Sequence, residues 1–278
     1  MKVGISTATF FSKVLTEDSF SVIQRCGGDT CEVFLTTFYE YTSAFAQLLK
    51  QRKGDFDVYS VHSLNTQFEP QLFNKVPRTY SDAESIFRSV LDVGKTIGAR
   101  AYTFHAQARL KQSVYIDPKF VGDRMSKLGD IASEYGIKLC LENVHWATFD
   151  SPEFFRQMKP YAQNIGTVLD IKQARLSGYD WREYIDVMGG TLTNVHVSDV
   201  KDGKIVMVGK GEFPFKELVA RLKDVGYDGP LIIEQYAGNY GRNHPLYGVP
   251  CRRGEVCLLQ RLLCYPQMCV RKRFQYLR

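Results

Sequence analysis

The amino-acid sequence predicts an α/β fold, a closed (β/α)8 barrel that forms a single domain. Strand-length apolar runs alternate with amphipathic runs of helix length, which is typical of a parallel sheet wrapped by helices. Eight such units follow one another in roughly 240 residues, which matches the size of this barrel. An open doubly wound sheet rarely has eight regular units, and the G-x-G-x-x-G that often follows its first strand is absent here.

The expected strands are rich in β-branched, leucine and aromatic residues. In chain order they cover residues 2–7, 31–36, 57–64, 101–106, 138–143, 165–171, 192–199 and 231–236. Each strand except the last is followed by a segment with helical spacing. In residues 80–99, apolar residues from Ile86 to Ile97 recur every three or four positions, and Gly98 provides a helix stop. Residues 213–229 repeat this arrangement just before the last strand.

Composition excludes several classes of protein. The chain has 278 residues, of which 44% are hydrophobic, and it contains no apolar run long enough to span a membrane. Its N-terminus is too polar for a signal peptide, and its seven cysteines are an odd number without zinc-site spacing. These features predict a cytoplasmic protein with reduced thiols.

The net charge of +6 is confined to the end of the chain. Residues from Arg242 onward include eight basic residues and one acidic residue, whereas the preceding part has 28 basic and 29 acidic residues. A nearly neutral body argues against nucleic acid as a partner. The chain therefore divides into a barrel, residues 1–240, and an atypical basic, cysteine-rich tail, residues 241–278.

The tail does not read as the polar-faced amphipathic helix that a barrel needs after its eighth strand. Four of the seven cysteines gather there, and Pro266 interrupts its apolar run. A shifted reading frame or a terminal recombination near residue 241 accounts for so abrupt a change. The tail would then replace the last barrel helix, with "CLLQRLL" able to occupy its position. A basic arm for nucleic acid and a structural zinc site are the alternatives.

Polar side chains stand at the carboxyl ends of the expected strands, where such a barrel carries its chemistry. Strands three to eight end in His62, His105, Glu142, Asp170, His196 and Glu234. Each residue alone has an ordinary explanation, such as a helix cap, a rim salt bridge or a hydrogen-bonded core histidine. Three carboxylates at one spot, however, are costly unless a cation neutralises them. The last four residues suit one divalent ion, Mn²⁺, Co²⁺, Mg²⁺ or Zn²⁺.

Four segments resemble motifs of a known family. "CLENVH", "TVLDIKQA", "NVHVSD" and "LIIEQY" are similar, in this order, to segments of the xylose isomerase-like TIM barrel superfamily. That superfamily includes sugar and sugar-phosphate isomerases, ketose 3-epimerases, inosose dehydratases and endonuclease IV. The resemblance covers residues 1 to about 240, and the spacing of the four strand-end residues is close to that of ketose 3-epimerases.

The resemblance implies a metal-dependent enzyme that acts on a carbohydrate. Glu142, Asp170, His196 and Glu234 would bind one divalent metal ion, and the two glutamates would act as acid and base on opposite faces of a cis-enediolate. Proton return to the same carbon gives epimerisation, return to the neighbouring carbon gives isomerisation, and loss of a β-hydroxyl gives dehydration of a keto-sugar or keto-inositol. His62 and His105 would hydrogen-bond substrate hydroxyls or a phosphate.

Two departures from the family pattern bear on the alternatives. Gln173 stands where epimerases and endonuclease IV commonly have a histidine; it can hydrogen-bond a sugar but is a poor metal ligand. The segment "DVKDGKIVMVGKG" lacks the Asp-x-His that the third zinc of endonuclease IV needs, which argues against a trinuclear nuclease. A two-metal phosphodiester hydrolase and a catalytically silent sugar-binding barrel remain as alternatives, and the oligomeric state, with a homo-oligomer among the options, stays open.

Three further residues have two interpretations each. Trp146 is either an aromatic platform for a sugar ring or a packing residue. Lys210, between two glycines in "GKGEFPF", either meets a substrate phosphate or belongs to a mobile loop. Asp199 either orients a ligand residue or caps the following turn.

Overall fold

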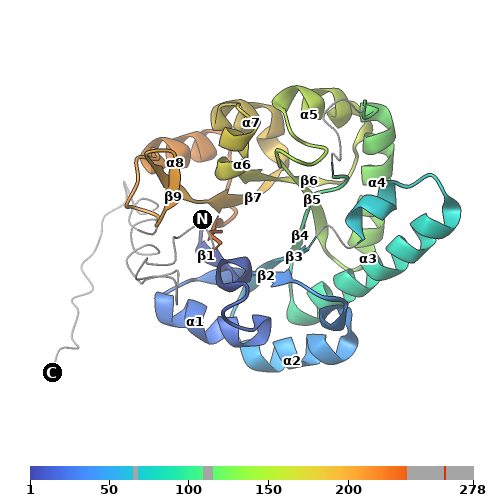
Figure 1. Cartoon of the computed structure of the whole chain (residues 1–278), viewed down its shortest axis with the longest axis horizontal. Coiled ribbons are helices and arrows are strands. Elements are labelled where there is room, and N and C mark those ends of the chain that lie inside the picture. The colour runs from blue at the N-terminus through green and yellow to red at the C-terminus, as the bar shows by residue number, and fades with distance from the viewer. Residues whose placement is uncertain (65–67, 109–114, 237–259, 261–278) are drawn as a thin grey trace.

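Eight parallel strands close into a barrel, which confirms the predicted fold class (Figure 1). The computed structural model describes residues 1–64, 68–108, 115–236 and 260. The strands are β1 (Val3–Ser6), β2 (Thr30–Leu35), β3 (Val58–Ser63), β4 (Ala101–Phe104), β5 (Lys138–Glu142), β6 (Gly166–Asp170), β7 (Leu192–Val197) and β10 (Leu231–Ile233). Each strand overlaps one of the eight predicted runs, and β10 pairs with β1 to close the ring.

Helices surround the barrel on the outside, as Figure 1 shows. They are α1 (Ser19–Cys26), α2 (Ser43–Lys53), α3 (Pro77–Ile97), α4 (Pro118–Glu134), α5 (Pro152–Met158), α6 (Ile171–Leu176), α7 (Trp181–Met188) and α8 (Phe215–Asp224). The predicted stop at Gly98 is present, since this residue caps α3 in the left-handed region at φ 81°. No helix in the described part of the chain is both long and apolar enough to cross a bilayer.

An antiparallel hairpin, β8 (Asp199–Lys201) and β9 (Lys204–Val206), follows β7 directly. The sequence predicts one strand over residues 192–199. The structure divides this run, so that Asp199 belongs to the hairpin and not to the barrel. The hairpin lies at the carboxyl end of β7 and forms one wall of the cavity considered below.

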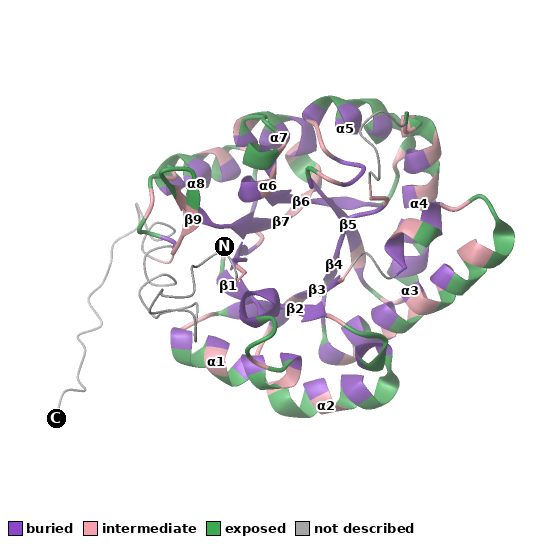
Figure 2. Ribbon diagram, in the orientation of Figure 1, coloured by how far each residue is buried: buried purple, intermediate pink, exposed green. Residues whose placement is uncertain are grey.

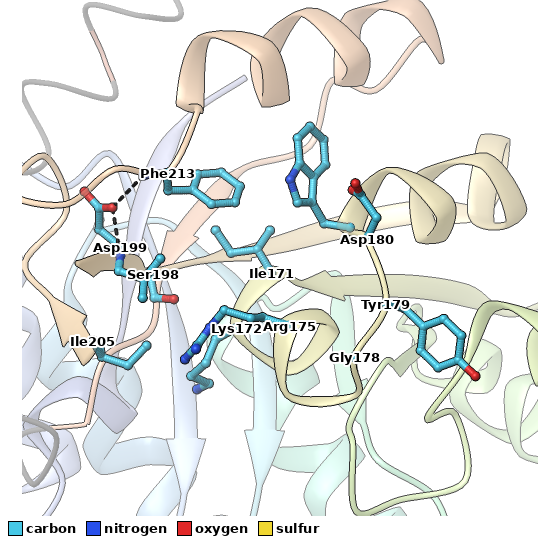
Figure 3. A pocket seen from close by; sticks show the side chains of 12 residues that line it. Ile171, Lys172, Arg175, Gly178, Tyr179, Asp180, Ser198, Asp199, Ile205 and Phe213 are labelled. Carbon is cyan, nitrogen blue, oxygen red and sulfur yellow. Dashed lines mark hydrogen bonds between the residues drawn. The ribbon is translucent and has the colours of Figure 1, made fainter. Parts of the chain in front are cut away.

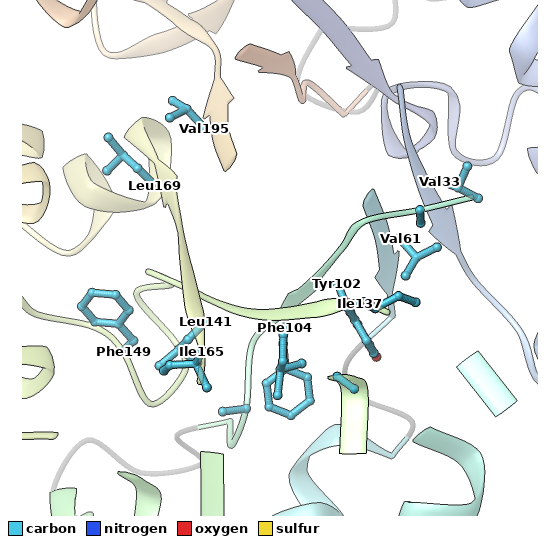
Figure 4. Close-up of a cluster of buried hydrophobic side chains, with 14 of the residues drawn as sticks. Val33, Val61, Tyr102, Phe104, Ile137, Leu141, Phe149, Ile165, Leu169 and Val195 are labelled. Carbon is cyan, nitrogen blue, oxygen red and sulfur yellow. The ribbon is translucent and has the colours of Figure 1, made fainter. Parts of the chain in front are cut away.

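Alternate residues of the strands face two different environments. Outward side chains, such as Val33, Val61, Leu141 and Val195, pack under the helices into one large apolar core (Figure 4). Figure 2 shows the barrel strands mostly buried, whereas the helices around them carry both buried and exposed residues. Inward side chains are largely polar, and they fill the barrel toward its carboxyl end.

Gly4 shows how closely the strands approach inside the barrel. A Cβ on this residue would lie 2.5 Å from Ile232 Cδ1 and 2.9 Å from the carbonyl oxygen of Thr30. The neighbouring strand backbone cannot give way, so β1 requires glycine at this position.

The predicted tail, residues 241–278, lies outside the described residues apart from Gln260. The amide nitrogen of the Gln260 side chain is 3.2 Å from the carbonyl oxygen of Gly27. The boundary near residue 240 and the replaced last helix stay predictions.

Candidate active site at the carboxyl end of the barrel

The structure brings the four predicted ligand residues together. Glu142 ends β5, Asp170 ends β6, His196 is the penultimate residue of β7, and Glu234 follows β10. One ligand atom from each lies within 4.8 Å of the others, and none of the four residues is more than 4% exposed. They form the four-residue cluster, which parallel strands create because their carboxyl ends meet at one mouth of the barrel.

His196 is the centre of this cluster. Its Nδ1 lies 2.9 Å from Glu142 Oε1 and 3.3 Å from Glu234 Oε2. The two carboxylates therefore face the same imidazole nitrogen from different strands. A group that binds at this nitrogen is within reach of both glutamates.

His62 and His105 join the cluster from one side. Their Nε2 atoms are 2.9 Å apart, and His105 Nε2 is 3.0 Å from Glu142 Oε2. His62 Nδ1 lies 3.6 Å from Glu234 Oε1. Both predicted substrate-binding histidines thus contact the carboxylates that the sequence places at the ends of other strands.

Glu32 is a buried member of the site that the sequence analysis missed. It lies inside β2, is 0% exposed, and accepts hydrogen bonds from Ser60 Oγ at 2.8 Å, Thr103 Oγ1 at 2.6 Å and Asn194 Nδ2 at 3.2 Å. Glu32 does not stand at the end of its predicted strand, residues 31–36, where the chemistry of such a barrel is expected. The available signal was an acid in the middle of an apolar strand, which is stable only when paired.

Lys172 is the second residue that sequence reasoning missed. It follows β6 on α6, is buried, and places its Nζ 3.5 Å from Asp170 Oδ2 and 3.8 Å from Glu234 Oε2. A lysine is almost never this buried unless it is paired. Its ammonium group offsets part of the negative charge of the cluster.

The charges of the cluster shift its pKa values strongly. Burial alone would raise the pKa of Glu142, but the imidazoles of His196 and His105 lower it to about 2. Burial opposes a charged imidazole, yet Glu234 and Glu32 raise the pKa of His62 to about 10. Carboxylates and imidazoles thus hold each other in the charged form.

Burial and neighbouring charges also shift the pKa values of His196 and Asp170. Against the effect of burial, the carboxylates of Glu32, Glu234 and Glu142 raise the pKa of His196 well above its ordinary value. The pKa of Asp170 is raised, first by burial and then by nearby carboxylates, although Lys172 opposes this.

The donor set of the four-residue cluster fits a divalent ion. Three carboxylates and one imidazole suit the hard to borderline ions Mg²⁺, Mn²⁺, Co²⁺ and Zn²⁺. Glu234 Oε1 is buried without a hydrogen-bond partner among the described residues, which leaves a lone pair for such an ion. A cation at His196 Nδ1 would take the place of the proton that this nitrogen shares with two glutamates.

Gln173 and Trp146 lie at the rim of the cluster. The backbone N–H of Gln173 donates to Asp170 Oδ1 at 2.9 Å, and its side-chain oxygen is 2.6 Å from Nδ1 of the exposed His145. The half-buried Trp146 ring lies 5.3 Å from the ring of His105. Both predicted residues are therefore beside the cluster.

Asp199 begins the β8–β9 hairpin, and Lys210 lies in the loop that follows this hairpin. Asp199 accepts hydrogen bonds from the backbone N–H groups of Gly209, Gly211 and Phe213 at 2.8–3.1 Å. This carboxylate therefore holds the loop in place and does not contact the four-residue cluster. Lys210 lies between the two glycines and is exposed, so the structure does not bring its ammonium group against the buried cluster.

Sequence comparisons find relatives over most of the chain. The uncharacterized protein MJ1311 of Methanocaldococcus jannaschii is 30% identical over 250 residues, which are 84% of this chain and 83% of that protein. A ketose 3-epimerase of Arthrobacter globiformis is 22% identical over 204 residues, 69% of each protein.

Solved structures share the fold. D-psicose 3-epimerase with D-tagatose from Clostridium cellulolyticum H10 gives a TM-score of 0.76 at 16% identity, covering 95% of this chain and 99% of that chain. The IOLI protein with a binding zinc atom gives 0.70 at 17% identity, covering 94% and 96%. The family model described as xylose isomerase-like TIM barrel matches residues 20–248. The chain therefore belongs to the xylose isomerase-like TIM barrel family.

Proposed function

We propose that this protein is a metal-dependent isomerase or epimerase of a sugar or sugar phosphate. The observation that carries the proposal is the position of Glu142 and Glu234, whose carboxylates face one imidazole nitrogen of His196 from two strands. Two carboxylates on either side of one point can remove a proton from a carbon and return it from the other side.

The four-residue cluster would hold the metal ion. When bound there, a divalent ion supplies Lewis-acid chemistry that acidifies the C–H bond next to a sugar carbonyl. One of the two glutamates takes that proton, and the other protonates the cis-enediolate on its opposite face, which inverts the carbon. Return of the proton to the neighbouring carbon isomerises the sugar, and departure of a β-hydroxyl would dehydrate it.

Other side chains of the site would position the substrate. The imidazoles of His62 and His105 offer hydrogen bonds to hydroxyl groups, and the ammonium of Lys172 is placed to stabilise negative charge that develops on the substrate oxygens. Trp146 offers an aromatic face beside His105. Gln173, at the rim, offers an amide for a further hydroxyl.

The relatives support this proposal. The Arthrobacter protein is a ketose 3-epimerase, the Clostridium structure is an epimerase with a ketose, and the IOLI structure has a zinc atom. The fold and the strand-end residues of this chain suit the same class of reaction.

The test measures metal content and proton exchange in one set of proteins. Wild type, Glu234→Gln and the exposed control Glu153→Gln are loaded with Mn²⁺ and Zn²⁺ in turn and analysed by elemental analysis. Incorporation of solvent deuterium at the carbon beside the carbonyl of D-tagatose, D-fructose and their phosphates is then followed by NMR. We expect one metal equivalent in wild type and in the control, and a loss of exchange of about 10²- to 10⁴-fold in Glu234→Gln.

The same experiment separates the alternatives. Exchange that survives in Glu234→Gln would contradict the acid/base role of this residue. Metal binding without exchange on any of these ketoses or their phosphates would favour the silent sugar-binding barrel.

A two-metal phosphodiester hydrolase is the second candidate. His62, His105 and Glu142 form a second group of ligand atoms within 4.8 Å of one another, and it shares Glu142 with the four-residue cluster. Two zinc equivalents, one of them lost in His105→Asn, together with incision of an abasic-site duplex, would favour this function. The nearly neutral charge of the barrel weighs against it, because phosphate backbones are bound by basic surfaces.

A further inference from the structure

We propose that a cavity beside the four-residue cluster binds an anionic group of the substrate, so that the substrate is a phosphorylated or carboxylated sugar. This inference rests on the proposed function, because it takes the cluster as the place of the sugar carbonyl. It adds a binding site, formed around Lys172 and Arg175, for the other end of the molecule.

The cavity has a volume of about 350 Å³ and lies at the carboxyl end of the barrel (Figure 3). Its walls come from α6, the start of α7, the β8–β9 hairpin and the loop before α8, and they include Lys172, Arg175, Trp181, Ser198 and Phe213. A small-metabolite site has this size.

Lys172 connects the cavity to the cluster. It lines the cavity, and its Nζ also lies 3.5 Å from Asp170 Oδ2 and 3.8 Å from Glu234 Oε2. Both separations exceed the 2.7–2.9 Å of a charge-assisted hydrogen bond. The three donors of this ammonium group are therefore not saturated by the two carboxylates, and an oxygen anion in the cavity can accept from it.

Arg175 provides a second positive charge on the same helix. It is three residues beyond Lys172, and Figure 3 shows both side chains on the same side of the cavity. Arg175 is exposed and forms no ion pair with any residue that the structure describes. A guanidinium without a partner at the edge of a cavity suits bidentate binding of a phosphate or carboxylate.

Neither of the two acids in the cavity wall pairs with Lys172 or Arg175. Asp180 caps α7 and pairs with Arg182 at 2.8 Å. Asp199 accepts backbone N–H groups, including that of Gly211 at 2.9 Å. Both carboxylates already have donors of their own, so Arg175 is the charged group of the wall that the described residues leave without a partner.

The rest of the cavity wall strengthens the attraction between these cations and a bound anion. The Trp181 and Phe213 rings lie 5.7 Å apart and give the cavity an apolar wall. Ser198 is buried, lines the cavity and adds a hydroxyl to it. Charged groups attract an anion more strongly when low-dielectric walls replace water. A neutral sugar would leave Arg175 without a counter-charge among the described residues.

The test compares neutral and anionic ligands on the metal-loaded, full-length protein. Calorimetry measures the Kd of a free ketopentose, of its 5-phosphate and of an aldonic acid of the same length, for wild type, Arg175→Gln and Arg25→Gln. Arg25 is an exposed arginine in the last turn of α1, so its variant removes the same charge from a different helix. The aldonic acid and the 5-phosphate distinguish a carboxylate from a phosphate as the natural group.

We expect wild type to bind one of the two anionic ligands at least tenfold more tightly than the ketopentose. Arg175→Gln should reduce this preference by roughly tenfold to a hundredfold, and Arg25→Gln should retain it within about twofold. Equal affinity for all three ligands in wild type overturns the proposal. So does a preference that survives in Arg175→Gln, since the metal alone would then hold the anion.

Proton exchange, measured in parallel, separates this proposal from the proposed function. If the protein exchanges protons on a ketose but shows no preference for anions that depends on Arg175, the anion site is refuted and the proposed function stands. An Arg175-dependent preference without exchange on any sugar would support the anion site and refute the isomerase function.

Discussion

Glu32 holds the two histidines of the site from inside the barrel, and its replacement is the most direct test of this arrangement. Glu32→Gln preserves the shape of the side chain and removes its negative charge. The carboxylate lies 3.2 Å from His62 Nδ1 and 3.1 Å from His196 Nε2, in addition to its three neutral donors. Glutamine offers one oxygen instead of two, so its amide nitrogen must face at least one group that also donates.

The size of the effect follows from these contacts. Each of the two imidazole contacts is a hydrogen bond between charged groups, worth about 1.5–3 kcal/mol. Glutamine avoids the cost of burying a carboxylate, which offsets part of the loss. We expect the free energy of unfolding of the metal-free protein to fall by about 2–4 kcal/mol. Because Glu32 orients His196, the Kd for the metal should rise by roughly 10- to 100-fold.

Urea unfolding measures the first quantity, and competition with a chromogenic chelator measures the second. Ser60→Ala is the matched control, since it removes one neutral hydrogen bond to Glu32, 2.8 Å long, and keeps the charge. This control should lose only about 1 kcal/mol and bind metal nearly as wild type does. The reasoning is refuted if Glu32→Gln unfolds at the urea concentration of wild type and binds metal with the same Kd.

Three further predictions follow from the structure. In the metal-free protein, the raised pKa of His62 stabilises the fold fully below about pH 6.5, and this contribution is lost as the pH rises to about 10. The lowered pKa of Glu142 stabilises the fold above about pH 4.5, and this contribution is lost as the pH falls to about 2. The free energy of unfolding, measured in urea across this pH range, should therefore be highest between about pH 4.5 and about pH 6.5. A maximum outside this range would contradict the prediction. Gly211→Ala should displace the loop held by Asp199, because a Cβ there would overlap this carboxylate; limited proteolysis should cut that loop faster than in wild type, and equal rates would exclude the effect. Phe87→Ala, in the apolar core, should lower the free energy of unfolding by about 3–5 kcal/mol in urea, and a loss below about 1 kcal/mol would show that the core refills the space.

The fold and the four-residue cluster were predictable because both depend on simple periodicities. Eight strand-length runs separated by helical segments leave few ways to form one parallel sheet, and a barrel is the way that satisfies all eight. Once the strands are parallel, their carboxyl ends meet. The inward-facing side chains at these ends therefore lie close together, as they do for Glu142, Asp170, His196 and Glu234.

The hairpin after β7 was not predictable in the same way. Residues 192–199 read as one apolar, β-branched run, and nothing local separates Val197 from Asp199. The break arises because Asp199 binds the backbone of residues far along the chain, such as Phe213. A local sequence pattern cannot predict a hydrogen bond between residues that are this far apart in the sequence.

The sequence by itself determined the order of the strands, the closed barrel and the residues at the ends of the strands. Only the tertiary structure decided the roles of Glu32 and Lys172 and the existence of the cavity. A period of two tells that Glu32 and Val33 face opposite sides of a strand, but not which side is the interior of the barrel. Burial and pairing with groups from three other strands make that choice, because a buried charge is stable only where its partners meet it.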